Sequence, residues 1–94
     1  ERLADDHARA RRTARACADA APGSVDPDLV ETNIVNLDVS VVGATGADVV
    51  AAAADRGVRC YAVGTQAVRL VWHLDVDDAA TDHAIDVLTS ILTG

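Results

Sequence analysis

The segment at residues 67–74, AVRLVWHL, constrains the fold most strongly, because its alternating residues predict a β-strand with two unlike faces. The first set of alternate residues is apolar and comprises Val68, Leu70, Trp72 and Leu74. The second set contains Arg69, Val71 and His73. We therefore expect a sheet with one face covered by helices and the other uncovered, with Arg69 and His73 on the uncovered face.

Three segments have apolar residues at spacings of three and four and are predicted to be helices. The first covers residues 2–21, and the second covers residues 47–56 with Gly57 as a left-handed stop. The last would be capped by Asp77 or Asp78 and would run to about residue 92. The inner stripe of the first helix would comprise Leu3, His7, Ala10, Ala14, Cys17 and Ala21. The inner stripe of the last helix would comprise Thr81, Ala84, Ile85, Leu88, Ile91 and Leu92. A solvated face is predicted for the arginines that lie mostly off the first stripe, Arg9, Arg11, Arg12 and Arg15.

Two further segments, residues 32–39 and 58–63, are predicted to be strands. In the first of them Val35, Leu37 and Val39 would face the core, and Ile34 and Asn36 would face the other way. The short link at residues 64–66 predicts a hairpin with the strand that follows. The element order α-β-α-β-β-α predicts an α+β fold. We expect a two-layer sandwich with a mainly antiparallel sheet of three strands or slightly more and helices on one face.

The chain has the size of one domain, and its apolar residues are small. It contains 19 Ala and 14 Val, but no Phe or Met. Such a composition predicts a thin core, which is typical of a domain that packs against another domain. The chain opens with Glu1-Arg2-Leu3 and contains no Met. We therefore expect residues 1–94 to be a single small domain cut from a larger protein.

The charged residues exclude several classes of function. The net charge is −7, which argues against nucleic acid and anionic membrane surfaces as partners. No apolar run reaches the roughly 18 residues that a membrane span needs. All eight basic residues are arginine. Since lysine is missing, this chain cannot by itself bond covalently through an amine to a carbonyl substrate or to pyridoxal phosphate.

Histidine and cysteine do not form a pattern that predicts catalysis or metal binding. His7, His73 and His83 belong to separate elements, so no metal site is predicted. Cys17 and Cys60 lack a neighbouring base and do not form a disulfide framework. We expect both cysteines to be reduced and buried, although a single bridge between them is an alternative. No catalytic residue is assigned in this chain.

Two sites for anions remain as hypotheses. The stretch GATGADV at residues 43–49 places glycines before a helix N-terminus, but it matches no phosphate-binding fingerprint, so a plain loop is favoured. Arg69 carries a guanidinium whose fork matches a carboxylate. From the pattern alone, a structural ion pair for Arg69 and a structural hydrogen bond for His73 are the more frequent alternatives.

The sequence VRLVWHLDV at residues 68–76 resembles the Arg-Leu-Val-Thr-His-Leu-Asp-Val segment of low-specificity L-threonine aldolases. These enzymes belong to the aspartate-aminotransferase-like class that uses pyridoxal phosphate. Residues 2–12, RLADDHARARR, resemble the helix that opens the small C-terminal domain of that family. Residues 31–35 and 56–64, ETNIV and RGVRCYAVG, resemble its first strand and the edge before the arginine strand. The resemblance covers essentially the whole chain.

The resemblance implies that this chain is the C-terminal small domain of a lyase that cleaves β-hydroxy-α-amino acids to glycine and an aldehyde. It implies that a missing large domain holds pyridoxal phosphate through a lysine, and that this chain alone binds no cofactor and is inactive. The arginine matching Arg69 binds the carboxylate of the amino-acid substrate, and His73 would support the same surface. By the same resemblance, the parent enzyme is expected to be a cytoplasmic homo-oligomer.

Two positions depart from the family pattern. Trp72 stands where threonine is usual, and Asn36 stands where an apolar residue is frequent. Alternation would turn Trp72 toward the helices, where it would thicken the core.

Two other functions stay open: a stand-alone or regulatory amino-acid-binding module of ferredoxin-like type, and the small domain of another pyridoxal-phosphate enzyme, such as an aminotransferase or β-eliminating lyase.

Overall fold

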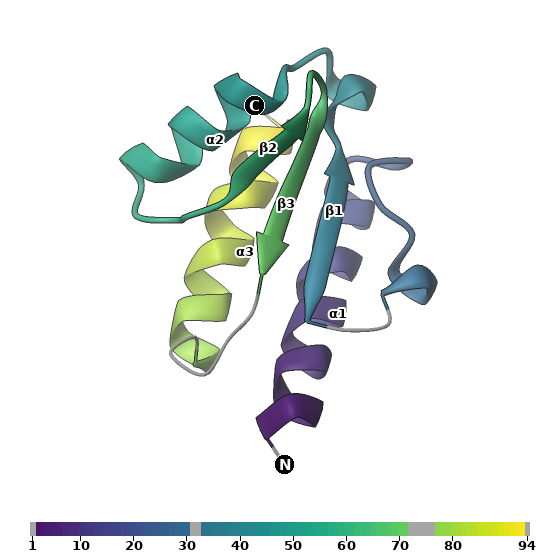
Figure 1. Ribbon diagram of the computed structural model, residues 1–94, viewed down its shortest axis with the longest axis vertical. Helices are drawn as coiled ribbons and strands as arrows, with labels where there is room; N and C mark the ends of the chain where they lie inside the picture. Colours follow the sequence, from purple (N-terminus) through teal and green to yellow (C-terminus); the bar gives the residue numbers. More distant parts are fainter. Residues whose placement is uncertain (1, 31–32, 72–76, 94) are drawn as a thin grey trace.

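The computed structural model describes residues 2–30, 33–71 and 77–93, and in this part of the chain three α-helices lie against one face of a three-stranded sheet (Figure 1). The elements in chain order are α1 (Arg2–Ala20), the 3₁₀ helix η1 (Pro27–Leu29), β1 (Ile34–Asp38), the 3₁₀ helix η2 (Val39–Val42), α2 (Gly46–Asp55), β2 (Tyr61–Gly64), β3 (Ala67–Val71) and α3 (Asp78–Thr93). The predicted α+β sandwich with the order α-β-α-β-β-α is confirmed.

The sheet has the order β1-β3-β2, and both pairs of neighbours are antiparallel. Strands β1 and β2 are therefore parallel to each other, with β3 between them and α2 connecting them. This arrangement is a split β-α-β unit. It makes β3, the last strand in sequence, the central strand of the sheet, and β2 joins it through the predicted hairpin.

The core lies between the sheet and the helices, and its residues are small. On β1 and β3 the alternation holds, because Val35, Leu37, Val68 and Leu70 are buried while their strand neighbours are exposed. The buried stripe of α1 comprises Ala10, Thr13, Ala14, Cys17 and, just beyond the helix, Ala21. The buried stripe of α3 comprises Thr81, Ala84, Val87, Leu88 and Leu92. Both predicted stripes are confirmed in outline, except that the burial of Leu3 lies outside what the structure describes. The structure adds Asp6, Thr13 and Val87 as buried residues, and it leaves His7, Ile85 and Ile91 only partly buried.

The second strand begins later than the sequence predicts. It was expected at residues 58–63, whereas β2 covers Tyr61–Gly64. The reason is the end of α2, where the Val58 N–H donates to the Ala53 carbonyl and the Gly57 N–H donates to the Ala54 carbonyl. Gly57 has the left-handed backbone, with φ of 83°, that this cap requires. The Val58 amide therefore completes the helix instead of pairing in the sheet.

The first turn of α3 resolves which aspartate caps that helix. The Asp77 carboxylate accepts a hydrogen bond from the Ala80 N–H at 2.8 Å, and the Asp77 carbonyl accepts one from the Thr81 N–H at 2.9 Å. Asp77 therefore caps α3, which leaves the Asp78 carboxylate available for contacts with α1.

Candidate functional site

Arg69 lies at the centre of the helix-free face of the sheet. It stands on β3, directly opposite Asn36 of β1 on one side and Tyr61 of β2 on the other. Side chains that are directly opposite in antiparallel strands share a face, and all three residues are exposed. Val68 and Leu70, which flank Arg69 in the chain, point to the helices and are buried. The expectation that Arg69 faces away from the helical layer is confirmed.

The guanidinium of Arg69 is held by a neutral group. Its Nε–H donates a hydrogen bond to Oδ1 of Asn36 over 2.9 Å. Among residues 2–30, 33–71 and 77–93, no carboxylate forms an ion pair with Arg69. A structural ion pair is therefore not the role of Arg69 in the described part of the chain.

Most neighbours of Arg69 on this face are apolar, and one is an acid, Asp38, which is exposed two residues beyond Asn36 on β1 and lies opposite Ala67. Ile34 of β1 lies opposite Val71 of β3, next to the Asn36–Arg69 pair along the strands, and both side chains are partly exposed. On the other flank, Tyr61 is 53% exposed. We call this surface, formed by Ile34, Asn36, Tyr61, Arg69 and Val71, the open face. An exposed apolar surface around a charged group is typical of a binding site or an interface.

His73 of the predicted site lies outside the described residues, as does its neighbour Trp72. The supporting role of His73 and the inward orientation of Trp72 therefore stay predictions. The structure adds two neighbours of Arg69 that sequence reasoning did not assign to the site, Asn36 and Tyr61. Asn36 stood out in the sequence only as a departure from the family pattern, in which an apolar residue is frequent at this position. Tyr61 has no such signal, because only the strand register brings it to Arg69.

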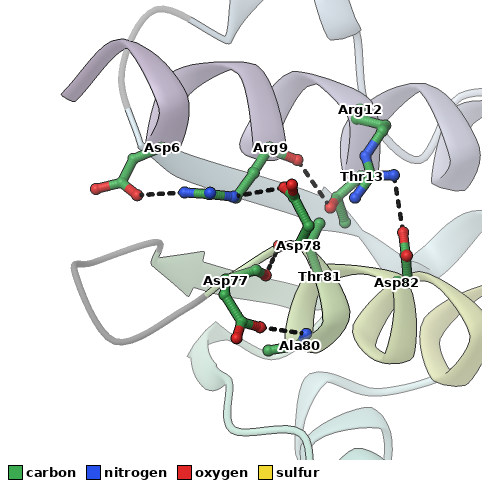
Figure 2. A network of polar contacts seen from close by, with 9 residues as sticks. All are labelled: Asp6, Arg9, Arg12, Thr13, Asp77, Asp78, Ala80, Thr81 and Asp82. Atoms are coloured by element: carbon green, nitrogen blue, oxygen red, sulfur yellow. Dashed lines mark hydrogen bonds and ion pairs between the residues drawn. The ribbon is translucent and has the colours of Figure 1, made fainter. Parts of the chain in front are cut away.

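Arg9, Arg11 and Arg12 of α1 form ion pairs, and Figure 2 shows those of Arg9 and Arg12. Nε of Arg9 lies 2.9 Å from an oxygen of Asp78, and Nη1 of Arg9 lies 3.4 Å from an oxygen of Asp6. Nη1 of Arg12 lies 2.7 Å from an oxygen of Asp82. The predicted solvated face is wrong for Arg9, because packing of α1 against α3 brings Asp78 to it and leaves its side chain only 21% exposed.

The Arg9–Asp78 ion pair shifts the pKa of both groups that form it. The hydrogen bond from Arg9 is the main reason that the pKa of Asp78 is lowered from its usual value. The same contact raises the pKa of Arg9. The carboxylates stabilise the charge on these arginines and occupy part of their hydrogen-bonding groups, which makes α1 a poor receptor for a further anion.

The loop at residues 43–49 is built for packing. The Thr45 hydroxyl accepts from the Asp48 N–H at 3.2 Å, and the Gly46 N–H donates to the Thr65 carbonyl at 2.8 Å. A Cβ atom on Gly46 would lie only 2.9 Å from the Ala67 carbonyl oxygen. Gly46 therefore allows α2 to approach the β2–β3 turn, and amides at the start of α2 are satisfied by the chain itself. These contacts support the plain-loop interpretation.

Two of the histidines have structural contacts. Nε2 of His7 donates to the Val30 carbonyl, and Nε2 of His83 donates to the Arg56 carbonyl, each over 2.7 Å. Within the three described ranges, histidine, cysteine and acidic residues do not gather in a group of three that could hold a metal ion.

Both cysteines are free and buried, as expected from the sequence. Burial raises the pKa of the Cys17 thiol to about 12, and it also raises the pKa of Cys60. Thiols with such pKa values are poor nucleophiles at neutral pH. The cysteines are therefore weaker candidates for a functional site than the open face is.

No protein-family model matches this sequence, and no curated protein matches it significantly. The described helices include none with the length and apolar character needed to cross a membrane. The features of this chain that bear on function are therefore the open face and the resemblance of its central strand to the arginine strand of threonine aldolases.

Proposed function

We propose that this chain is the C-terminal small domain of a pyridoxal-phosphate-dependent, threonine-aldolase-like lyase, and that Arg69 binds the substrate carboxylate. The substrates would be β-hydroxy-α-amino acids, cleaved to glycine and an aldehyde. One observation carries the proposal: Arg69 stands on the helix-free side of the central strand, where it contacts Asn36 and, in the described part of the chain, has no acid partner.

The chemistry of the open face supports a carboxylate as ligand. A guanidinium can bind both oxygens of a carboxylate through two parallel N–H donors. Ile34, Tyr61 and Val71 flank Arg69 and would exclude water from it once a second surface covers them. Lower access of water strengthens the attraction between the guanidinium and the carboxylate. Binding the carboxylate would orient the Cα–Cβ bond that is cleaved.

The catalytic centre of such an enzyme must lie largely outside this chain. Pyridoxal phosphate, when bound, stabilises the negative charge that develops at Cα. The chain contains no lysine that could hold it, so a large domain would supply that residue. We expect this chain alone to be inactive and to bind no cofactor. His73 as a supporting residue, and a cytoplasmic homo-oligomer as the parent enzyme, belong to the same proposal.

The proposal is tested by assaying the parent protein with its large domain for release of glycine from L-threonine. Arg69→Lys removes the planar fork, and kcat/KM should fall by roughly 30-fold to several thousand-fold, equivalent to about 2–5 kcal/mol for a buried pair. The matched control is Arg15→Lys, the same change at an exposed position of α1. It should leave kcat/KM unchanged. Equal kcat/KM for Arg69→Lys and the wild type would refute the role of Arg69.

A second candidate function is favoured by the topology. The split β-α-β unit with sheet order β1-β3-β2 is also found in ferredoxin-like folds, and an amino-acid-binding module of that type would use the same open face. Binding of L-threonine by the 94-residue chain, without glycine release by any longer natural form, would favour the module. Transamination or β-elimination by the longer form would instead identify a different pyridoxal-phosphate enzyme.

A further inference from the structure

We infer that Asn36 is a positioning residue for Arg69, which presents the terminal edge of the guanidinium to the carboxylate. The inference rests on the proposed function, and it adds a residue at which this chain differs from the family pattern. The role that we infer for Asn36 is to orient the guanidinium of Arg69. Asn36 itself is not expected to contact the substrate.

The geometry of the pair supports this role. A guanidinium has a side edge, formed by Nε and one Nη, and a terminal edge, formed by both Nη atoms. Oδ1 of Asn36 lies 2.9 Å from Nε of Arg69 and therefore occupies the side edge. The terminal edge then remains as the edge at which two parallel N–H groups can meet a carboxylate.

The strand register makes the contact persistent. Asn36 and Arg69 are directly opposite in the antiparallel pair of β1 and β3, so the sheet itself fixes the distance between their backbones. Neighbouring pairs along these strands are regular, from Ile34 with Val71 to Leu37 with Val68. Both side chains therefore extend from rigid elements, which suits a binding group better than a loop does.

An amide has a property at this position that neither an acid nor an apolar residue has. It accepts a hydrogen bond from Nε without neutralising the positive charge of Arg69. An aspartate would pair with the guanidinium, as Asp78 pairs with Arg9 on the helical side, and would therefore compete with the ligand. An apolar residue would leave the side edge of the guanidinium free, and the arginine could bind a carboxylate in two orientations.

The first test measures KM and kcat for L-threonine in the parent protein. Asn36→Ala should raise KM about fivefold, because one hydrogen bond to Arg69 is lost. Asn36→Asp should raise KM about tenfold or more, because the new charge competes for the guanidinium. In both variants kcat should stay within about twofold of the wild type. Gln66→Glu is the matched control, since it makes the same amide-to-acid change at the exposed β2–β3 turn, and it should leave KM unchanged.

The second test uses the 94-residue chain and needs no activity. The Nε–H resonance of Arg69 is followed by NMR while acetate is added as the probe. In the wild type, acetate should shift the Nη–H resonances and leave Nε–H in place, because Asn36 already holds it. In Asn36→Ala the Nε–H resonance should move with acetate, and the acetate affinity should fall about fivefold. Circular dichroism establishes that each variant is folded.

The two tests separate the inference from the proposed function. If Arg69→Lys raises KM but both Asn36 variants match the wild type, the inference is overturned and the proposed function stands. If the wild-type parent does not cleave threonine, the proposed function is overturned and the acetate titration decides the inference. Acetate affinity that is no higher in the wild type than in Asn36→Ala would then overturn it.

Discussion

Arg9 and Arg12, on the helical side of the molecule, each contact an aspartate of α3 (Figure 2). Arg69, on the open face of the sheet, contacts the neutral side chain of Asn36 instead. The chain has 15 acidic residues against eight arginines, so acids are available for pairing. Arg69 is thus held by an amide, whereas Arg9 and Arg12 are paired with acids, and this contrast supports the proposal that the charge of Arg69 serves recognition.

The ion pairs of the helical side contribute little energy individually. The side chains of Arg12 and Asp82 are each about half exposed, and pairs of this kind stabilise a protein by at most about 1 kcal/mol. The stability of the fold must therefore come from burial between the helices and the sheet. A comparison of the two sheet faces tests this conclusion directly.

The largest effect is expected from the same substitution made on the two faces of β3. Val68 is fully buried against the helices, whereas Val71 is 36% exposed on the open face. Val68→Ala should lower the free energy of unfolding by about 2 kcal/mol, because it removes buried methyl groups and leaves a cavity. Val71→Ala should lower it by less than about 0.5 kcal/mol. Urea denaturation followed by circular dichroism measures both, and equal losses would contradict the assignment of the faces.

A smaller effect is expected where α2 approaches the sheet. A Cβ atom on Gly46 would meet the carbonyl oxygens of Ala67 and Gly64 at 2.9 and 3.0 Å, and backbone atoms cannot easily move away. Gly46→Ala should therefore cost about 1.5 kcal/mol of stability. Gly64→Ala is the control, because its Cβ would only touch the Ala67 side chain at an ordinary distance of 3.5 Å. The melting temperatures of the Gly46→Ala and Gly64→Ala variants are compared. Equal values would contradict the close packing of α2 at Gly46.

The smallest effect concerns the pH dependence of the helical ion pairs. Arg9 lowers the pKa of Asp78, so the stabilisation from this carboxylate is fully present above the ordinary aspartate pKa. It is lost as the pH falls through the lowered pKa of the folded state. Arg9→Gln should raise the pKa of Asp78 toward its usual value in an NMR titration. The pKa of Asp38, which the Ser40 hydroxyl lowers, is the internal control and should not change.

Local patterns in the sequence were sufficient to predict most of the fold. The alternation in residues 67–71 predicted which side chains of β3 are buried, and the helical spacing predicted the buried stripes of α1 and α3. The predicted start of β2 was wrong because the Val58 N–H donates to the C-terminal cap of α2. A cap of this kind depends on the path of the chain after Gly57.

The candidate site was predictable only in part. Arg69 could be assigned to the uncovered face, because alternation along one strand decides the direction of each side chain. Its partners could not, because strand order and register decide which residues of other strands lie opposite it. Sequence reasoning therefore treated Asn36 as a departure from a family pattern, whereas the structure shows it bonded to Arg69.

The sequence by itself determined the identity and order of the elements, the sides that they bury and the exposure of Arg69, since these follow from periodicities within single segments. Only the tertiary structure decided that β3 is the central strand, that Asn36 holds the guanidinium and that Arg9 and Arg12 pair with α3. The physical reason is that these contacts join residues far apart in the chain, and the packing of helices and strands alone sets the distances between them.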